Sequence, residues 1–153
     1  MNIEVKEVEL AEQPAIAIRE TLPVDQLPAF FGRAFGTLMA YAGEHGAGFA
    51  GPPFAQYYSV EPQAVDVEAA FPLTQVVEGE GEVHALTLAA GEAAEVLYRG
   101  PYSGMEAVYG ELFQWIAQHG KRPAGPCREV YLNEPGAVAE SELETLIIQP
   151  IAG

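Results

Sequence analysis

A single carboxylate stands among apolar and aromatic neighbours in residues 125–132, whose sequence is GPCREVYL. The Gly-Pro pair predicts a turn that leads into a strand over residues 127–132. Because successive side chains of a strand point to opposite faces, Glu129 should share one face with Cys127 and Tyr131. The sequence therefore places an acid beside a phenol on one face of a sheet.

Glu129 is the residue best suited to carry chemistry in this stretch. If its face lines a cavity, the carboxylate must be paired, protonated or available to a cationic ligand, since an unpaired buried charge is costly. A desolvated carboxyl with a raised pKa beside Tyr131 could also exchange a proton with water, which is general acid–base chemistry. The alternative is an ordinary solvated glutamate on a half-exposed sheet.

Aromatic side chains supply the π faces on which a cation or a flat drug-like molecule can rest. Those that we expect at a ligand site are Tyr57, Tyr131, Tyr102, Tyr109, Phe35 and Trp115. Tyr57 and Tyr131 lie in expected strands, where a hydroxyl group that needs a partner suits a cavity wall. Phe35, Tyr109 and Trp115 lie at helical spacing, for which packing of a helix on a sheet is the simpler explanation.

The histidines and the cysteine do not form a metal or nucleophile pattern. His45 and His119 each precede a glycine at an expected helix end, so we expect them to cap helices rather than to bind a metal. His84 has no partner at ligand spacing, and no metal or cofactor site is predicted. Cys127 has no evident base beside it, which argues against a role as nucleophile.

Length and charge predict one folded domain that attracts cations. The chain has 153 residues, of which 49% are hydrophobic, enough for a sizeable core. Lys and Arg total 7 against 22 for Asp and Glu, a net charge of -15, which argues against binding to nucleic-acid phosphates or to an anionic membrane. The field should attract positively charged small molecules. Most of the acid should serve only solubility. Asp66 and Glu68 lie on an expected strand and could add negative potential to a ligand groove, but a solvated outer face is the default expectation.

The sequence is typical of a cytoplasmic protein. The single Cys127 excludes an internal disulfide framework. The N-terminal residues from Met1 lack a basic segment followed by an apolar run, and no stretch approaches the roughly 18 apolar residues of a membrane span.

Hydrophobic periodicity predicts helices over about residues 27–45 and 104–119, where apolar residues recur at spacings of three and four. Alternation predicts strands over residues 3–10, 15–20, 54–60, 65–71, 83–88, 93–99, 127–132 and 143–151. We expect residues 3–10 and 15–20 to pair as a hairpin, and residues 83–88 and 93–99 to pair as a second one. The acidic, glycine-rich residues 78–82 should form an exposed connector.

The two halves of the chain resemble each other. The sequence EHGAGFAGPPFAQYY from Glu44 aligns with QHGKRPAGPCREVYL from Gln118, and the helical stripes match as well. This predicts an internal duplication of about 70 residues, with repeats over about 3–73 and 83–151 of one domain spanning residues 1–153. Two pseudo-symmetric strand-helix-strand-strand modules would leave a ligand groove at their seam. Because Glu129 aligns with Ala55, the groove would hold a charge from the second repeat that has no counterpart in the first.

The duplication, the paired His-Gly helix ends, the two Ala-Gly-Pro loops, YRGPY at 98–102 and EVYL at 129–132 together resemble GyrI-like small-molecule-binding domains, also called AraC-type effector-binding domains. The resemblance covers nearly the whole chain. It implies an α+β fold with an antiparallel sheet, two helices and a central groove that binds lipophilic, often cationic compounds. It also implies that a glutamate at the position of Glu129 meets the ligand's charge, with aromatic walls around it.

The resemblance leaves three functions open. Many relatives carry a helix-turn-helix segment before this domain and regulate transcription, but none fits ahead of Ile3, so we expect a stand-alone protein that binds lipophilic cations. The second function is hydrolysis of small strained electrophiles, in which Glu129 and Tyr131 would be catalytic. The third is contact with a protein partner such as DNA gyrase or a separate regulator, for which the sequence offers no distinct patch.

Overall fold

The computed structural model describes residues 3–153, so Met1 and Asn2, where the N-terminal segment discussed above begins, lie outside the described residues. The longer elements are β1 (Val5–Leu10), β2 (Gln13–Leu22), α1 (Leu27–Glu44), β3 (Phe54–Glu61), β4 (Ala64–Pro72), β5 (His84–Leu88), β6 (Gly91–Arg99), α2 (Met105–Gln118), β8 (Cys127–Tyr131) and β9 (Glu144–Ala152). Shorter ones are η1 (Val24–Gln26), η2 (Tyr102–Gly104), β7 (Arg122–Pro123) and η3 (Glu140–Glu142). Within residues 3–153 no helix combines the length and the apolar character that crossing a membrane requires.

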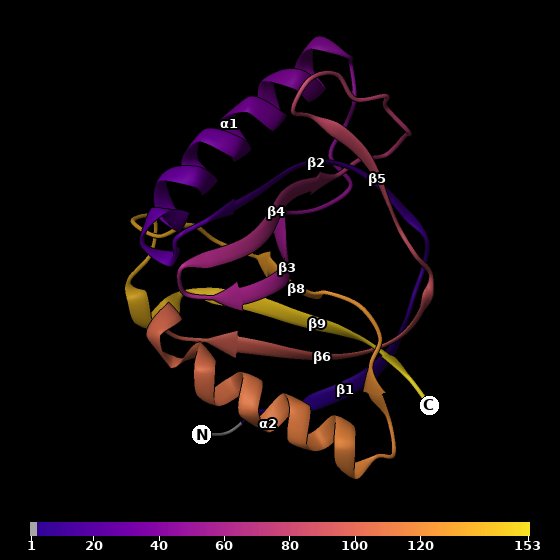
Figure 1. Cartoon of the computed structure of the whole chain (residues 1–153), viewed down its shortest axis with the longest axis vertical. Coiled ribbons are helices and arrows are strands. Elements are labelled where there is room, and N and C mark those ends of the chain that lie inside the picture. Colours follow the sequence, from indigo (N-terminus) through magenta and orange to yellow (C-terminus); the bar gives the residue numbers. More distant parts are fainter. Residues whose placement is uncertain (1–2) are drawn as a thin grey trace. The chain divides into compact units, whose positions relative to one another are not determined.

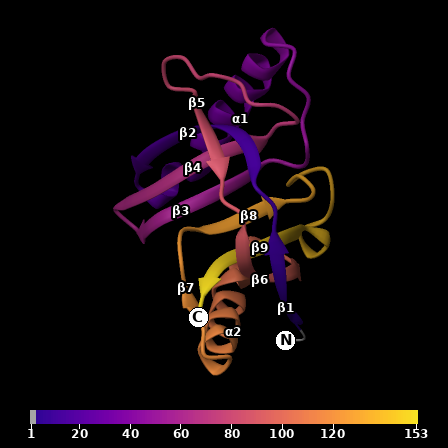
Figure 2. The same cartoon turned by 90° about the vertical axis from the view of Figure 1, so that its right-hand side faces the viewer.

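The chain folds into two compact units. One contains the chain up to Ala11 together with Ala90–Gly153, and the other contains Glu12–Ala89. The first unit has an antiparallel sheet in the order β1-β6-β9-β8, with β7 on β9 and α2 packed over β6 (Figure 1). The second has the order β3-β4-β2-β5, with α1 packed over β4 and β2 (Figure 2). The α+β class with antiparallel strands and two helices is confirmed, whereas the internal duplication and the single-domain organisation stay predictions.

The two expected hairpins, one formed by residues 3–10 and 15–20 and the other by residues 83–88 and 93–99, are wrong. Strand β1 pairs with β6, from Val5 opposite Val96 to Leu10 opposite Gly91, and β2 pairs with β5 and β4. A two-residue hairpin turn requires residues that adopt positive φ, usually Asn or Gly, and the joints Ala11-Glu12 and Ala89-Ala90 offer none. In contrast, β3 pairs with β4 and β8 pairs with β9, as the sequence predicted.

Both helices are confirmed, together with the function of their terminal histidines. The buried stripes are Phe30, Ala34, Leu38 and Ala42 in α1, and Met105, Val108, Leu112 and Ile116 in α2. His45 and His119 are the C-cap residues, and each is followed by a glycine with positive φ. Each histidine uses Nδ1 to contact the carbonyl oxygen four residues earlier, at 2.8 Å. In the part of the chain that the structure describes, no group of three or more His, Cys, Asp or Glu side chains is placed to hold a metal ion.

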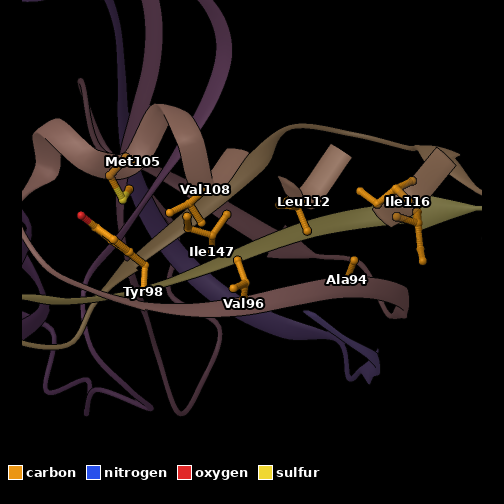
Figure 3. Close-up of a cluster of buried hydrophobic side chains, with 9 residues drawn as sticks. Ala94, Val96, Tyr98, Met105, Val108, Leu112, Ile116 and Ile147 are labelled. Atoms are coloured by element: carbon orange, nitrogen blue, oxygen red, sulfur yellow. The ribbon is translucent and has the colours of Figure 1, made fainter. Parts of the chain in front are cut away.

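A compact core joins α2 to the sheet of the first unit. Figure 3 shows side chains of β6, α2 and β9 that point toward one another, and they include Ala94, Val96, Tyr98, Met105, Val108, Leu112, Ile116 and Ile147. Tyr98 lies at the end of this core nearest η2, where its hydroxyl group donates a hydrogen bond to the carbonyl oxygen of Pro101 at 2.8 Å. The core therefore fixes the start of α2 relative to β6.

Gly104→Ala should destabilise the protein by about 1–3 kcal/mol, the usual cost of overpacking. A Cβ atom at Gly104 would lie 2.1 Å from the hydroxyl oxygen of Tyr98, which the bond to Pro101 holds in place. Urea unfolding measures the change. Gly110→Ala is the control, because Gly110 is exposed in α2, the helix that follows Gly104, with no atom within 4 Å of the new Cβ. The control should gain about 0.5–1 kcal/mol from helix propensity. Equal effects of the two substitutions would contradict the packing described for Tyr98.

Candidate functional site

Glu129 lies on β8 and faces the side of the sheet that carries α2. It is paired directly with Ile147 of β9, which belongs to the core beneath α2. Its carboxylate accepts two hydrogen bonds, one from the hydroxyl group of Tyr109 on α2 and one from that of Tyr131 on β8 at 2.9 Å. Glu129 is half-buried. Tyr131 lies beside Glu129 because residues two apart on a strand share a face, and Tyr109 reaches the carboxylate from α2, which packs on that face.

Burial raises the pKa of Glu129, whereas the hydrogen bonds from Tyr109 and Tyr131 act in the opposite direction. Among residues 3–153, no cationic side chain forms a salt bridge with this carboxylate. Arg128 is buried and, as the neighbouring strand residue, points to the opposite face. Glu129 is therefore a partly desolvated acid that is held by neutral donors, and the described residues provide it with no counter-ion.

Two further aromatic rings contact the tyrosines that bond to this acid. The ring of Tyr102 makes an edge contact with that of Tyr131, with centroids 6.2 Å apart. Burial and the nearby charge of Glu129 raise the pKa of Tyr102. Phe113, which sequence reasoning missed, stacks on Tyr109 with centroids 6.3 Å apart. Its spacing of four residues from Tyr109 on one helix was the available signal.

The other three predicted aromatic residues lie elsewhere in their units. Trp115 stacks on His119 with centroids 3.9 Å apart, at the end of α2 and partly buried against the core. Phe35 lies on α1 in the second unit, where it makes an edge contact with Phe71 at 5.6 Å. Tyr57 is half-buried on β3 of the same unit. The expected ligand contacts of these three side chains stay predictions.

Cys127 shares the face of Glu129 but is unsuited to nucleophilic chemistry. Burial, followed by the charge of Glu129, raises the pKa of its thiol to about 12. The thiolate is the reactive form, and it is a very small fraction at neutral pH. Cys127 therefore adds no nucleophile beside Glu129.

The second unit holds a buried acid that the sequence placed in solvent. Glu68 is only 2% exposed, so the expectation of a solvated outer face is wrong for this residue. Its carboxylate accepts hydrogen bonds from Gln56 at 3.0 Å and Tyr58 at 2.7 Å, and it contacts Nε2 of His84 at 2.6 Å. The strand order β3-β4-β2-β5 assembles this group from separate segments, which explains why no sequence spacing revealed a partner for His84. These contacts satisfy the Glu68 carboxylate within the protein.

The geometry at Glu129 suits two kinds of chemistry. A carboxylate without a counter-ion, flanked by aromatic faces, can neutralise an organic cation. A carboxyl group with a raised pKa beside two phenols can also transfer protons to and from a bound molecule. Both uses depend on Glu129, Tyr109 and Tyr131.

The solved structures that resemble this chain share its fold. One similar structure is that of EcmrR in a complex with DNA, with 20% sequence identity and a TM-score of 0.84. The match covers 97% of this chain and 57% of the EcmrR chain. The EcmrR C-terminal domain alone is matched over 99% of both chains, with 20% identity and TM-score 0.80. A hydrolase from Listeria innocua has 15% identity and TM-score 0.76, with coverage of 97% of this chain and 92% of its own. SAV2435 bound to tetraphenylphosphonium has 15% identity and TM-score 0.63, with coverage of 98% and 94%.

No curated protein sequence matches the chain. The family model for the GyrI-like small molecule binding domain, however, matches residues 3–152, which is nearly the whole chain. The α+β fold with an antiparallel sheet and two helices agrees with that match. The chain belongs to the family of GyrI-like small-molecule-binding domains.

Proposed function

We propose that this protein binds lipophilic cations, with the positive charge of the ligand against Glu129 and its apolar body against the rings of Tyr102, Tyr109 and Tyr131. The observation that carries the proposal is the half-buried Glu129 carboxylate, which lies among phenols without a salt-bridge partner in residues 3–153. A cation would supply the missing counter-charge, and aromatic faces stabilise cations by about 0.5–2 kcal/mol each.

Two further observations support a cationic ligand. The net charge of -15 favours the approach of cations from solution. SAV2435, which shares the fold, has been solved with tetraphenylphosphonium, a cation whose charge lies inside four apolar rings. A delocalised cation of this kind costs less to desolvate than an ammonium ion and offers no hydrogen bond to a competing acceptor.

The wild-type protein should bind tetraphenylphosphonium and reject tetraphenylborate, which has the same shape and the opposite charge. Isothermal titration at two salt concentrations measures both affinities. Long-range attraction to the acidic surface weakens with salt, whereas contact with a half-buried carboxylate persists, because the Debye length falls to about 3 Å at 1 M salt. Equal binding of the two ions, or loss of phosphonium binding in high salt, would show that no specific cation site exists.

Hydrolysis is a second candidate, because the raised pKa of Glu129 and its two phenol neighbours are the parts of an acid–base site. Glu129 would accept a proton from water as the water oxygen attacks a strained carbon, and a tyrosine hydroxyl would protonate the leaving atom. Wild-type protein incubated with styrene oxide in ¹⁸O-labelled water should then release labelled diol, and Glu129→Gln should slow this reaction by roughly a hundredfold or more. Equal rates with both proteins and with buffer alone would remove this candidate.

A further inference from the structure

Thr145 on β9 is fully buried, at 0% exposure, and within residues 3–153 its hydroxyl oxygen has no hydrogen-bond partner. A buried hydroxyl group without a partner costs about 1–3 kcal/mol, and such groups are rare in folded proteins. Valine would fill the same space without that cost. The hydroxyl group of Thr145 therefore calls for an explanation other than packing.

The sheet register places Thr145 next to the Glu129 site. Thr145 of β9 is paired directly with Tyr131 of β8, and Ile147 is paired with Glu129 two residues along. These two cross-strand pairs are neighbours on the sheet face that carries α2. Diagonal neighbours in such an array have Cβ atoms about 7 Å apart. A single small molecule that places its charge at Glu129 could thus reach the hydroxyl group of Thr145.

Tyr98 and Tyr131 are the register partners of Thr145 on its two neighbouring strands. Tyr98 on β6 is paired with Thr145 on the side away from β8. Its hydroxyl oxygen is bonded to Pro101 and lies close against the backbone of Gly100 and Gly104, so this ring is fixed. Tyr131 is half-buried, and its hydroxyl group bonds to the same carboxylate that a cation would occupy. Thr145 therefore lies between the fixed ring of Tyr98 and the strand that carries Glu129 and Tyr131.

We propose that Thr145 is a specificity-determining residue of the cation site, whose hydroxyl group bonds to an uncharged polar atom of a ligand held at Glu129. This inference rests on the proposed cation binding. The preferred ligands are then lipophilic cations that also carry a hydroxyl, ether or carbonyl group a few bonds from the charge.

The test compares tetraphenylphosphonium with (4-hydroxyphenyl)triphenylphosphonium, which differs by one hydroxyl group, on the wild type, Thr145→Val and Thr145→Ser. The wild type and Thr145→Ser should prefer the hydroxylated ion by about tenfold, the effect of one added hydrogen bond. Thr145→Val should lose this preference while its affinity for tetraphenylphosphonium stays unchanged. Without ligand, Thr145→Val should melt about 2–4 °C higher than the wild type, because an unsatisfied group is gone.

The outcomes separate this inference from the function on which it rests. Failure of the wild type to bind tetraphenylphosphonium would overturn both. Binding of tetraphenylphosphonium without any preference for the hydroxylated ion, or a preference that survives in Thr145→Val, would overturn the role of Thr145 alone. A lower melting temperature of Thr145→Val than of Thr145→Ser would also overturn it, because the hydroxyl group would then have a structural partner.

Discussion

Glu129→Gln is expected to weaken the binding of tetraphenylphosphonium by about 1–3 kcal/mol, or roughly 5- to 150-fold. The substitution keeps the shape of the side chain and removes its charge. The amide can still accept a hydrogen bond from one tyrosine and donate one to the other, so Tyr109 and Tyr131 keep their places. The loss of affinity should therefore report the charge of residue 129 rather than a collapse of the site, and isothermal titration measures it directly.

Two controls accompany this substitution. Tetraphenylborate should bind Glu129→Gln no more weakly than it binds the wild type, since the repelling charge has been removed. Glu92→Gln removes a carboxylate of the same unit that pairs with Lys121 at the surface and should leave phosphonium affinity within about twofold, because exposed pairs contribute little. An equal loss in Glu92→Gln and Glu129→Gln would mean that net charge alone governs binding.

Local sequence patterns predicted the elements and the central pair of the site. The helices begin and end within about two residues of their predicted limits, because apolar spacing and a His-Gly end are local signals. Glu129 and Tyr131 share a face and a hydrogen bond because strand alternation alone brings residues two apart together. The cap role of His45 and His119 followed from the same kind of local reasoning.

Contacts between distant segments could not be predicted in this way. The pairing of β1 with β6 joins residues about 90 positions apart, and nothing in residues 3–10 specifies that partner. Tyr109 reaches Glu129 only because α2 packs on the sheet face to which Glu129 points, and His84 reaches Glu68 only through the strand order of its sheet. The buried Thr145 resembles any threonine of an alternating strand until its neighbours on β6 and β8 are known.

The raised pKa of Glu129 should make the free protein less stable as pH rises. The native carboxyl group keeps its proton above the ordinary value of about 4.3, at which the unfolded chain loses it. The stability that Glu129 contributes is thus fully present below that value and is lost as pH rises through the native pKa. Glu129→Gln lacks this titration. Urea unfolding between pH 4 and pH 8 should show the variant gaining stability over the wild type with rising pH, while the other acids affect both proteins alike.

Cation binding should respond to pH in the opposite direction, because the ionised carboxylate is the form that attracts the ligand. As pH falls below the native pKa of Glu129, the affinity of the wild type for tetraphenylphosphonium should fall by up to about tenfold per pH unit. Binding should also release a proton in that range, since the cation lowers the pKa of Glu129, and calorimetry in two buffers of different ionisation enthalpy measures this release. Glu129→Gln should show neither effect. If the wild-type affinity, like that of Glu129→Gln, did not change with pH, the ligand's charge would not lie at this carboxylate. This would hold even if the stability of the free protein depended on pH as expected.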